Sequence, residues 1–216
     1  MTTGKGMRLY DYELSGNCYK LRLLLHWLGL QYQRIAVNFH PGREHRSPAF
    51  LRDINPLGQL PVLADGDFLL RDAQACLVYL ASQYDRAGHW YPDDAATRGR
   101  ITTWLATADD LTRSIAAARQ HYSFGMAADI ARCEALARAS LRLLDDALAE
   151  NQASGRPWLA GTHEPSIADI ACFPYAALAG EARIDLRPYP ALQAWIRAMR
   201  HRDGFIAMPG ILDPAL

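Results

Sequence analysis

Strand-like segments are confined to the first 70 residues of this chain, and this distribution constrains its fold more than any other feature of the sequence. Four short segments alternate apolar and polar residues or are rich in β-branched and large apolar residues, as strands are. They cover residues 7–12, 31–37, 62–64 and 68–70. From about residue 95 onward, apolar residues recur only with helical spacing. We therefore expect an α/β unit followed by an all-helical unit.

The helices predicted between these strands complete a small α/β domain. A helix over 18–28 joins the first two strands, which predicts a parallel pair with a right-handed crossover. A second, short helix is expected over 48–54. Asp65-Gly66-Asp67 predicts a hairpin turn, and Asp72 begins a third helix. Residues 1–84 are thus predicted to fold as βαβαββα.

The rest of the chain is predicted to be a linker and a helical domain. The linker covers 85–94 and contains Gly88 and Pro92, which interrupt regular structure. The all-helical C-terminal domain covers 95–216. Its predicted helices are 97–120, 127–150, 167–179 and 190–200.

Charge and hydropathy argue against two classes of partner. Lysine plus arginine and aspartate plus glutamate both number 23, so the formal net charge is zero and no basic surface for nucleic acid is expected. No apolar stretch reaches the roughly 18 residues of a membrane span. The first six residues lack the apolar core of a signal peptide. We expect a soluble, cytoplasmic protein.

The four cysteines argue against a metal site. Cys18, Cys76, Cys133 and Cys172 are scattered, and none has the C-x-x-C spacing of a zinc ribbon or a dithiol redox site. The last three lie in apolar helical patterns, where a buried and inert thiol is usual. We expect no bound metal.

The turn between the first strand and the first helix, Ser15-Gly16-Asn17-Cys18-Tyr19-Lys20, is a candidate site. Such a turn leaves free backbone N–H groups at a helix N-terminus and sets a hydroxyl and a thiol beside them. These groups can stabilise an anion, including a thiolate. An ordinary helix cap explains the same residues. The turn alone favours the ordinary cap slightly, and the rest of the chain has to decide between the two.

Three local patterns, in this order and spacing, resemble the cytosolic glutathione transferases. They are Asn55-Pro56-Leu57-Gly58-Gln59-Leu60-Pro61, Asp72 at a helix start, and Pro165-Ser166-Ile167-Ala168-Asp169 in the helical half. Ser166 and Asp169 also have capping-box spacing, which gives them a folding role. The resemblance implies a thioredoxin-like N-terminal domain, a helical C-terminal domain, a cytoplasmic homodimer, glutathione as co-substrate, and a role in detoxification.

The resemblance also implies how glutathione is held at the γ-glutamyl and cysteinyl positions. Pro61 is expected in the cis form, so that the backbone of Leu60 pairs with the cysteinyl part of glutathione like an added strand. Asp72 is expected to hold the ammonium. The N–H groups of Asp72 and Ala73 are expected to meet the γ-glutamyl carboxylate. The family usually has serine where this chain has Ala73, which removes a hydrogen bond of about 1 kcal/mol.

His45 and Gln59 are the residues expected at the glycine carboxylate. His45 matches a histidine of theta-like members, and Gln59 is the second donor. Arg46 is a possible substitute because a guanidinium fits a carboxylate. A solvated loop histidine is the alternative for His45.

Ser15 is the expected catalytic residue, because the turn aligns without a gap with theta- and zeta-like members. Its hydroxyl would donate to the glutathione sulfur, with Asn17 as a second donor. Lowering a thiol pKa by about two units requires roughly 2.7 kcal/mol, which one charge-assisted hydrogen bond and a helix N-terminus can supply. Cys18 is the alternative: with a gap, it matches the active cysteine of bacterial beta-class members, and the helix N-terminus would lower its pKa.

These residues predict a glutathione S-transferase that activates the glutathione thiolate for attack on a hydrophobic electrophile. Two alternatives remain: a glutathione-dependent disulfide reductase or thiol transferase, and a non-catalytic binding or regulatory relative. The electrophile is expected between the α/β domain and the first long helices. The residues expected to line that space are Asp109, Arg113, His121, Tyr122 and Phe124.

Overall fold

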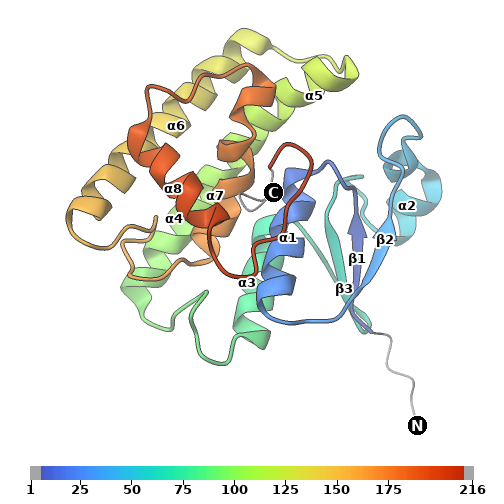
Figure 1. Cartoon of the computed structure of the whole chain (residues 1–216). Helices are drawn as coiled ribbons and strands as arrows, with labels where there is room; N and C mark the ends of the chain where they lie inside the picture. Colours follow the sequence, from blue (N-terminus) through green and yellow to red (C-terminus); the bar gives the residue numbers. More distant parts are fainter. Residues whose placement is uncertain (1–5, 212–216) are drawn as a thin grey trace.

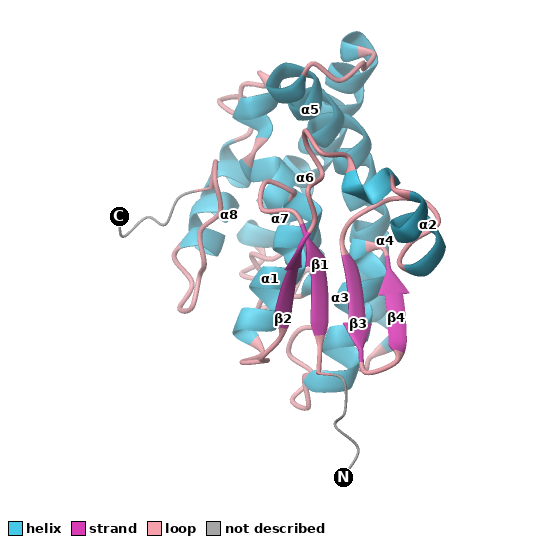
Figure 2. Ribbon diagram, turned by 90° about the vertical axis from the view of Figure 1, so that its right-hand side faces the viewer, coloured by secondary structure: helices cyan, strands magenta, loops and turns pink. Residues whose placement is uncertain are grey.

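The N-terminal unit is built on a four-stranded mixed sheet. The computed structural model describes residues 6–211 (Figure 1). The sheet has the order β2-β1-β3-β4, with β1 parallel to β2 and antiparallel to β3, and β3 antiparallel to β4 (Figure 2). The strands are β1 (Arg8–Asp11), β2 (Gln33–Ala36), β3 (Val62–Asp65) and β4 (Phe68–Arg71). The predicted parallel pair and hairpin are confirmed.

Three helices complete this unit and confirm the predicted βαβαββα order. Helices α1 (Gly16–Trp27) and α3 (Ala73–Tyr84) lie between the sheet and the helical half (Figure 1). Helix α2 (Pro48–Asp53) lies on the side away from the helical half and follows a short 3-10 turn, Glu44–Arg46.

As far as residue 211, the second unit is helical and contains no β-strand, only an isolated bridge between Met208 and Ile211. Its helices are α4 (Ala95–Leu111), α5 (Ala117–Phe124), α6 (Ile130–Ala153), α7 (Ile167–Ala177) and α8 (Pro190–Arg200), with a 3-10 turn at Ala179–Ala182. No helix of residues 6–211 is long and apolar enough to cross a membrane.

One predicted helix differs from the structure. A single helix was expected over 97–120, but a five-residue π-helical segment, Thr112–Ala116, separates α4 from α5. The helical path then continues to Phe124 and ends at Gly125, whose φ of 68° is the left-handed cap that glycine favours. A π turn adds one residue to a helical turn, and apolar periodicity alone does not reveal it.

Helix α7 is the centre of the helical unit. Every residue from 167 to 176 is buried, and α7 packs on α4, α1 and α3. Its first turn has the predicted capping box: the Ser166 N–H donates to the Asp169 carboxylate at 2.9 Å. Asp169 also accepts from the Trp195 indole N–H at 2.9 Å, which ties α7 to α8. The folding role predicted for this motif is confirmed.

Helix α1 is buried on both of its long sides. Residues 16 and 18–25 are buried, including the charged Lys20 and Arg22. The Tyr19 hydroxyl donates to the Ile206 carbonyl of the C-terminal segment at 2.5 Å. On the sheet side, Arg22 donates to the buried Asp11 carboxylate at 2.7 Å. The position of α1 is therefore set by both units.

Candidate active site

A cavity of about 870 Å³ lies where the two units meet. Its walls come from the β1–α1 turn, the loop before α2, the start of α3, and the α4–α5 region. Eight of the nine predicted site residues line it: Ser15, Asn17, His45, Gln59, Leu60, Pro61, Asp72 and Ala73. These eight residues, up to 58 positions apart in the sequence, are thus brought to one space.

Ser15 and Asn17 sit at the N-terminus of α1. Ser15 is the N-cap, and its Oγ accepts a hydrogen bond from the Cys18 N–H at 3.2 Å. The side-chain oxygen of Asn17 accepts from the Thr112 hydroxyl at 3.4 Å, so the π segment of the helical half reaches this turn. Both predicted catalytic side chains face the cavity beside a helix N-terminus.

Cys18 lies outside the cavity lining and is fully buried. Its Sγ accepts from the Tyr12 N–H at 3.5 Å. Burial, and then the nearby Asp11 carboxylate, raise the pKa of the Cys18 thiol to about 12, although the hydrogen bond from Ser15 opposes this. The expectation that the helix N-terminus lowers this pKa is corrected: desolvation outweighs the helix end.

The segment before β3 is fixed by a buried asparagine. The Asn55 amide donates to the Gln59 carbonyl at 2.9 Å, and its side-chain oxygen accepts from the Leu57 N–H at 3.0 Å. Gly58 has a φ of 58°, and a Cβ there would lie 2.7 Å from a backbone carbonyl oxygen. The Leu60–Pro61 peptide is cis, as expected.

Asp72 has an uncommon backbone conformation at the start of α3. Its φ is 77° and ψ is 127°, and its carboxylate caps the helix by accepting from the Ala75 N–H at 2.9 Å. A non-glycine residue in such a region costs of order 1–3 kcal/mol and is found most often at functional sites. The strain sets the exposed Asp72 at the rim of the cavity next to the first N–H groups of α3.

Two polar residues beside Asp72 were not predicted as a pair. The Gln74 amide donates to the Asp109 carboxylate of α4, across the boundary between the units. Burial, and then the charge of Asp72, raise the pKa of Asp109. The Gln74 side-chain oxygen is buried without a partner among the described residues. No local signal identifies this pair, because its members are 35 positions apart.

His45 is buried in an aromatic stack rather than solvated. Its ring stacks on Phe39 with centroids 4.1 Å apart, and Phe39 stacks on Tyr12 at 5.2 Å. The Nδ1 atom is buried and has no hydrogen-bond partner within residues 6–211. Burial lowers the pKa of His45, and the charges of Arg46 and Arg43 add to this, so the imidazole is neutral at pH 7. Arg46 itself donates to a backbone carbonyl.

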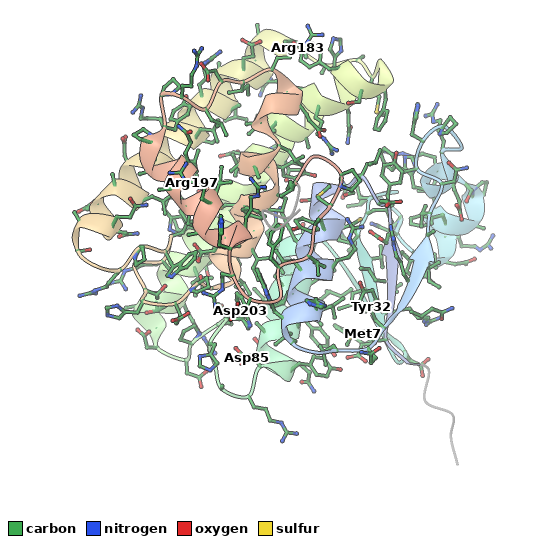
Figure 3. The ribbon with its side chains drawn as sticks, viewed as in Figure 1. Met7, Tyr32, Asp85, Arg183, Arg197 and Asp203 are labelled. Carbon is green, nitrogen blue, oxygen red and sulfur yellow. The ribbon has the colours of Figure 1, made fainter. Side chains whose placement is uncertain are left out.

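Only three of the five residues expected on the electrophile side line the cavity. Asp109, Arg113 and Phe124 line the cavity. His121 does not; its Nδ1 lies 2.8 Å from the Met126 carbonyl. Tyr122 also lies elsewhere, because its ring packs beneath the guanidinium of Arg183 at 4.0 Å, at the top of Figure 3.

Comparison with known proteins identifies the family. Two family models match, described as "Glutathione S-transferase, N-terminal domain" over residues 9–88 and "Glutathione S-transferase, C-terminal domain" over 127–198. Glutathione S-transferase theta-3 of Mus musculus is 28% identical over 240 residues, covering 98% of this chain and 94% of the mouse protein.

Solved structures give the same result. A glutathione S-transferase from Xanthobacter autotrophicus is 31% identical, with a TM-score of 0.82 over 98% of this chain and 100% of that chain. The yeast protein Ure2p in complex with glutathione has a TM-score of 0.82 over 94% of this chain and 98% of its own, at 23% identity. At that identity the Ure2p likeness concerns the fold.

Burial predicts that Cys18 is unreactive in the folded protein. With a pKa of about 12, only about one thiol in ten thousand is ionised at pH 8, against about one in ten at the ordinary value of 9. We expect iodoacetamide to label Cys18 at least ~100-fold more slowly in the native protein than in concentrated urea, measured by mass spectrometry. Labelling at similar rates in both states would contradict this.

Proposed function

This chain belongs to the glutathione S-transferase family, and we propose that it binds glutathione as the thiolate and transfers it to an electrophilic carbon of a hydrophobic substrate. One observation carries the proposal: Ser15, at the N-terminus of α1, shares one cavity with the Leu60–Pro61 segment and Asp72. Ser15 supplies a group that stabilises a thiolate. The Leu60–Pro61 segment supplies backbone groups for the cysteinyl residue of glutathione, and Asp72 supplies an anion for its ammonium.

Ser15 supplies the chemistry of activation. A cysteine-like thiol with a pKa near 8.5 is only a few per cent ionised at pH 7. A hydrogen bond from the Ser15 hydroxyl to the sulfur contributes about 1.5–3 kcal/mol, and the N-terminus of α1 adds about 0.3–1 kcal/mol. Together these lower the thiol pKa by about two units. The released proton leaves to solvent.

The transfer step then needs no cofactor. The thiolate sulfur attacks the electrophilic carbon, a sulfur–carbon bond forms, and the leaving group departs with the bonding electron pair. Asn17 is positioned beside Ser15 as a second donor to the sulfur.

Four other residues of the cavity bind the two ends of glutathione. Asp72 pairs with the γ-glutamyl ammonium, while the N–H groups of Asp72 and Ala73 receive the γ-glutamyl carboxylate at the start of α3. His45 and Gln59 receive the glycine carboxylate. The unpartnered Nδ1 of the neutral His45 ring supports this role, because a buried polar atom needs a partner.

The two alternatives receive less support. A thiol transferase using Cys18 needs an accessible thiolate, whereas this thiol is buried with a raised pKa. The second alternative is a non-catalytic, regulatory role. The nitrogen regulation fragment of yeast Ure2p has the same fold as this chain. The presence of Ser15, Asn17 and Asp72 in one cavity favours catalysis over that role.

Family membership also supports a cytoplasmic homodimer. We expect light scattering to give a mass of twice 24.1 kDa at micromolar concentration. A mass of 24.1 kDa that does not change with concentration would contradict the dimer.

Replacing Ser15 tests the catalytic assignment. We expect Ser15→Ala to raise the pKa of enzyme-bound glutathione by about 1–2 units, because one charge-assisted hydrogen bond is lost. The measurement is the ultraviolet absorbance of the bound thiolate across pH. Ser15→Thr retains a hydroxyl and is the matched control. The affinity for S-methylglutathione, which has no ionisable thiol, should change little; an unaltered thiolate titration in Ser15→Ala would refute the role.

Replacing Asp72 tests the ammonium contact. We expect Asp72→Asn to weaken glutathione binding about tenfold in calorimetry, because it removes the negative charge that faces the ammonium. Asparagine keeps a side-chain oxygen that can cap the helix, and asparagine tolerates a positive φ. A glutathione analogue without the α-amino group should bind wild type and variant equally. The control is Asp53→Asn, which removes an exposed carboxylate paired with Arg52. Equal weakening of glutathione and analogue would show that the variant acts through structure instead.

A further inference from the structure

An arginine of the helical half holds the turn that carries Ser15. Arg119, on α5, lines the cavity, and its Nη1 donates a hydrogen bond to the Leu14 carbonyl at 2.5 Å. Leu14 also lines the cavity and directly precedes Ser15 in the chain. The two bonded residues are 105 positions apart. The helical half therefore fixes a peptide group next to the proposed catalytic hydroxyl.

The three backbone carbonyls before the catalytic serine all have donors. The Tyr12 carbonyl accepts from the Ser15 N–H at 2.9 Å, and the Glu13 carbonyl accepts from the Arg22 guanidinium at 2.9 Å. The last of the three accepts from Arg119. Arg22 belongs to α1 and Arg119 to α5, so two guanidinium groups hold the turn from different units. The turn therefore has little freedom to move.

A carboxylate behind Arg119 orients its guanidinium. The Nε atom of Arg119 pairs with Glu181, in the 3-10 turn Ala179–Ala182 that follows α7. Arg119 lines the cavity, whereas Glu181 does not. The Arg119 side chain is 13% exposed and that of Glu181 is 36% exposed. Because water screens the more exposed charge more strongly, this ion pair presents its positive end to the cavity.

The positive charge of Arg119 reaches the aromatic residues around the catalytic turn. Burial raises the pKa of the phenols of Tyr12 and Tyr175, and the charge of Arg119 acts against this in both. The two tyrosines line the same cavity. Both phenols stay neutral at pH 7, so neither carries a negative charge that opposes the charge of Arg119.

We propose that Arg119 is a positioning residue for thiol activation: it fixes the peptide before Ser15 and turns the positive end of its ion pair toward the sulfur of glutathione. This inference rests on the proposed function. A fixed positive charge in a partly water-excluded site favours the thiolate over the thiol, which adds to the hydrogen bond from Ser15 and to the helix N-terminus. The proton still leaves to solvent, because a guanidinium stays protonated.

A purely structural tie between the two units makes different predictions. Arg119 joins α5 to the N-terminal unit, so its removal would lower the Tm under either interpretation. Only the electrostatic role moves the pKa of the bound thiol in a direction set by the sign of the charge that is removed. The thiol titration is therefore the deciding measurement.

The first test is Arg119→Gln, which removes the positive charge. We expect the pKa of bound glutathione to rise by about 0.5–1 unit, so that the thiolate fraction well below the pKa falls about three- to tenfold. Arg119→Lys keeps the charge and should shift the pKa less. Arg183→Gln is the matched control: it removes the same charge from an arginine that contacts α5 through the Tyr122 ring, outside the cavity, and should leave the titration unaltered. An unchanged pKa in Arg119→Gln, or an equal rise in Arg119→Lys, overturns the inference.

Replacing Glu181 tests the sign of the effect. Glu181→Gln removes the negative charge but keeps an oxygen that can accept from Arg119, so the thiol pKa should fall below the wild-type value. The double variant Arg119→Gln, Glu181→Gln leaves no unpaired charge, and it carries the test should Arg119→Gln alone fail to fold. Its thiol pKa should stay above the wild-type value, because the lost positive charge is the one that lines the cavity. A raised or unchanged pKa in Glu181→Gln, or a double variant at or below the wild-type value, overturns the inference.

Failure of the proposed function gives a different result. A wild-type protein that shows no thiolate titration at millimolar glutathione overturns both the function and the role of Arg119. A normal wild-type titration, with a pKa that rises in Ser15→Ala but not in Arg119→Gln, leaves the function intact and overturns only the role of Arg119.

Discussion

Burial of α1 between the sheet and the helical half is the constraint on which the rest of the structure depends. Because both long sides of this helix are covered, its N-terminus is the part that opens to a cavity, with Ser15 as the cap. Asp11 and Arg22 fix the helix to β1, and α7 covers the opposite side. A polar turn held this firmly has its hydroxyl and its helix N-terminus directed before any ligand arrives, which is the condition for stabilising an anion at low reorganisation cost.

Much of the fold follows from local signals in the sequence, whereas most of the predicted site residues follow from the resemblance to a known family. Strand alternation, the Asp65-Gly66-Asp67 turn and the Ser166–Asp169 box each act over a few residues, and each is present in the structure. Local signals do not show which groups that are far apart in the sequence contact one another in the fold. The Gln74–Asp109 pair and the approach of Thr112 to Asn17 depend on how the two units dock. The π segment was missed because an added residue leaves the apolar pattern of both flanking helices intact.

Ser15 and Cys18 show why position on a helix does not by itself decide chemistry. Both residues belong to the first turn of α1, where the helix dipole favours an anion. The cost of removing a thiolate from water is larger than that benefit, so the buried Cys18 stays protonated while the cavity-facing Ser15 does not need to ionise at all. The sequence places both Ser15 and Cys18 near a helix end. The burial of Cys18, with Tyr12 and Asp11 beside it, is what separates the roles of the two residues.

The π segment has a consequence for how substrate preference can change in such a chain. Thr112–Ala116 lies between α4, which packs on α7, and α5, whose residues face the outer part of the cavity. Because a π turn holds one extra residue while turning the chain through nearly the same angle as an α turn, deleting one residue within this segment would restore ordinary helical winding and leave the same face of α5 toward the cavity. The packing of α4 against α7 would also remain as it is. The segment thus lets the helical path gain or lose one residue beside the cavity without exchanging the α5 side chains that face the electrophile, so preference changes by substitution on α5 rather than by length.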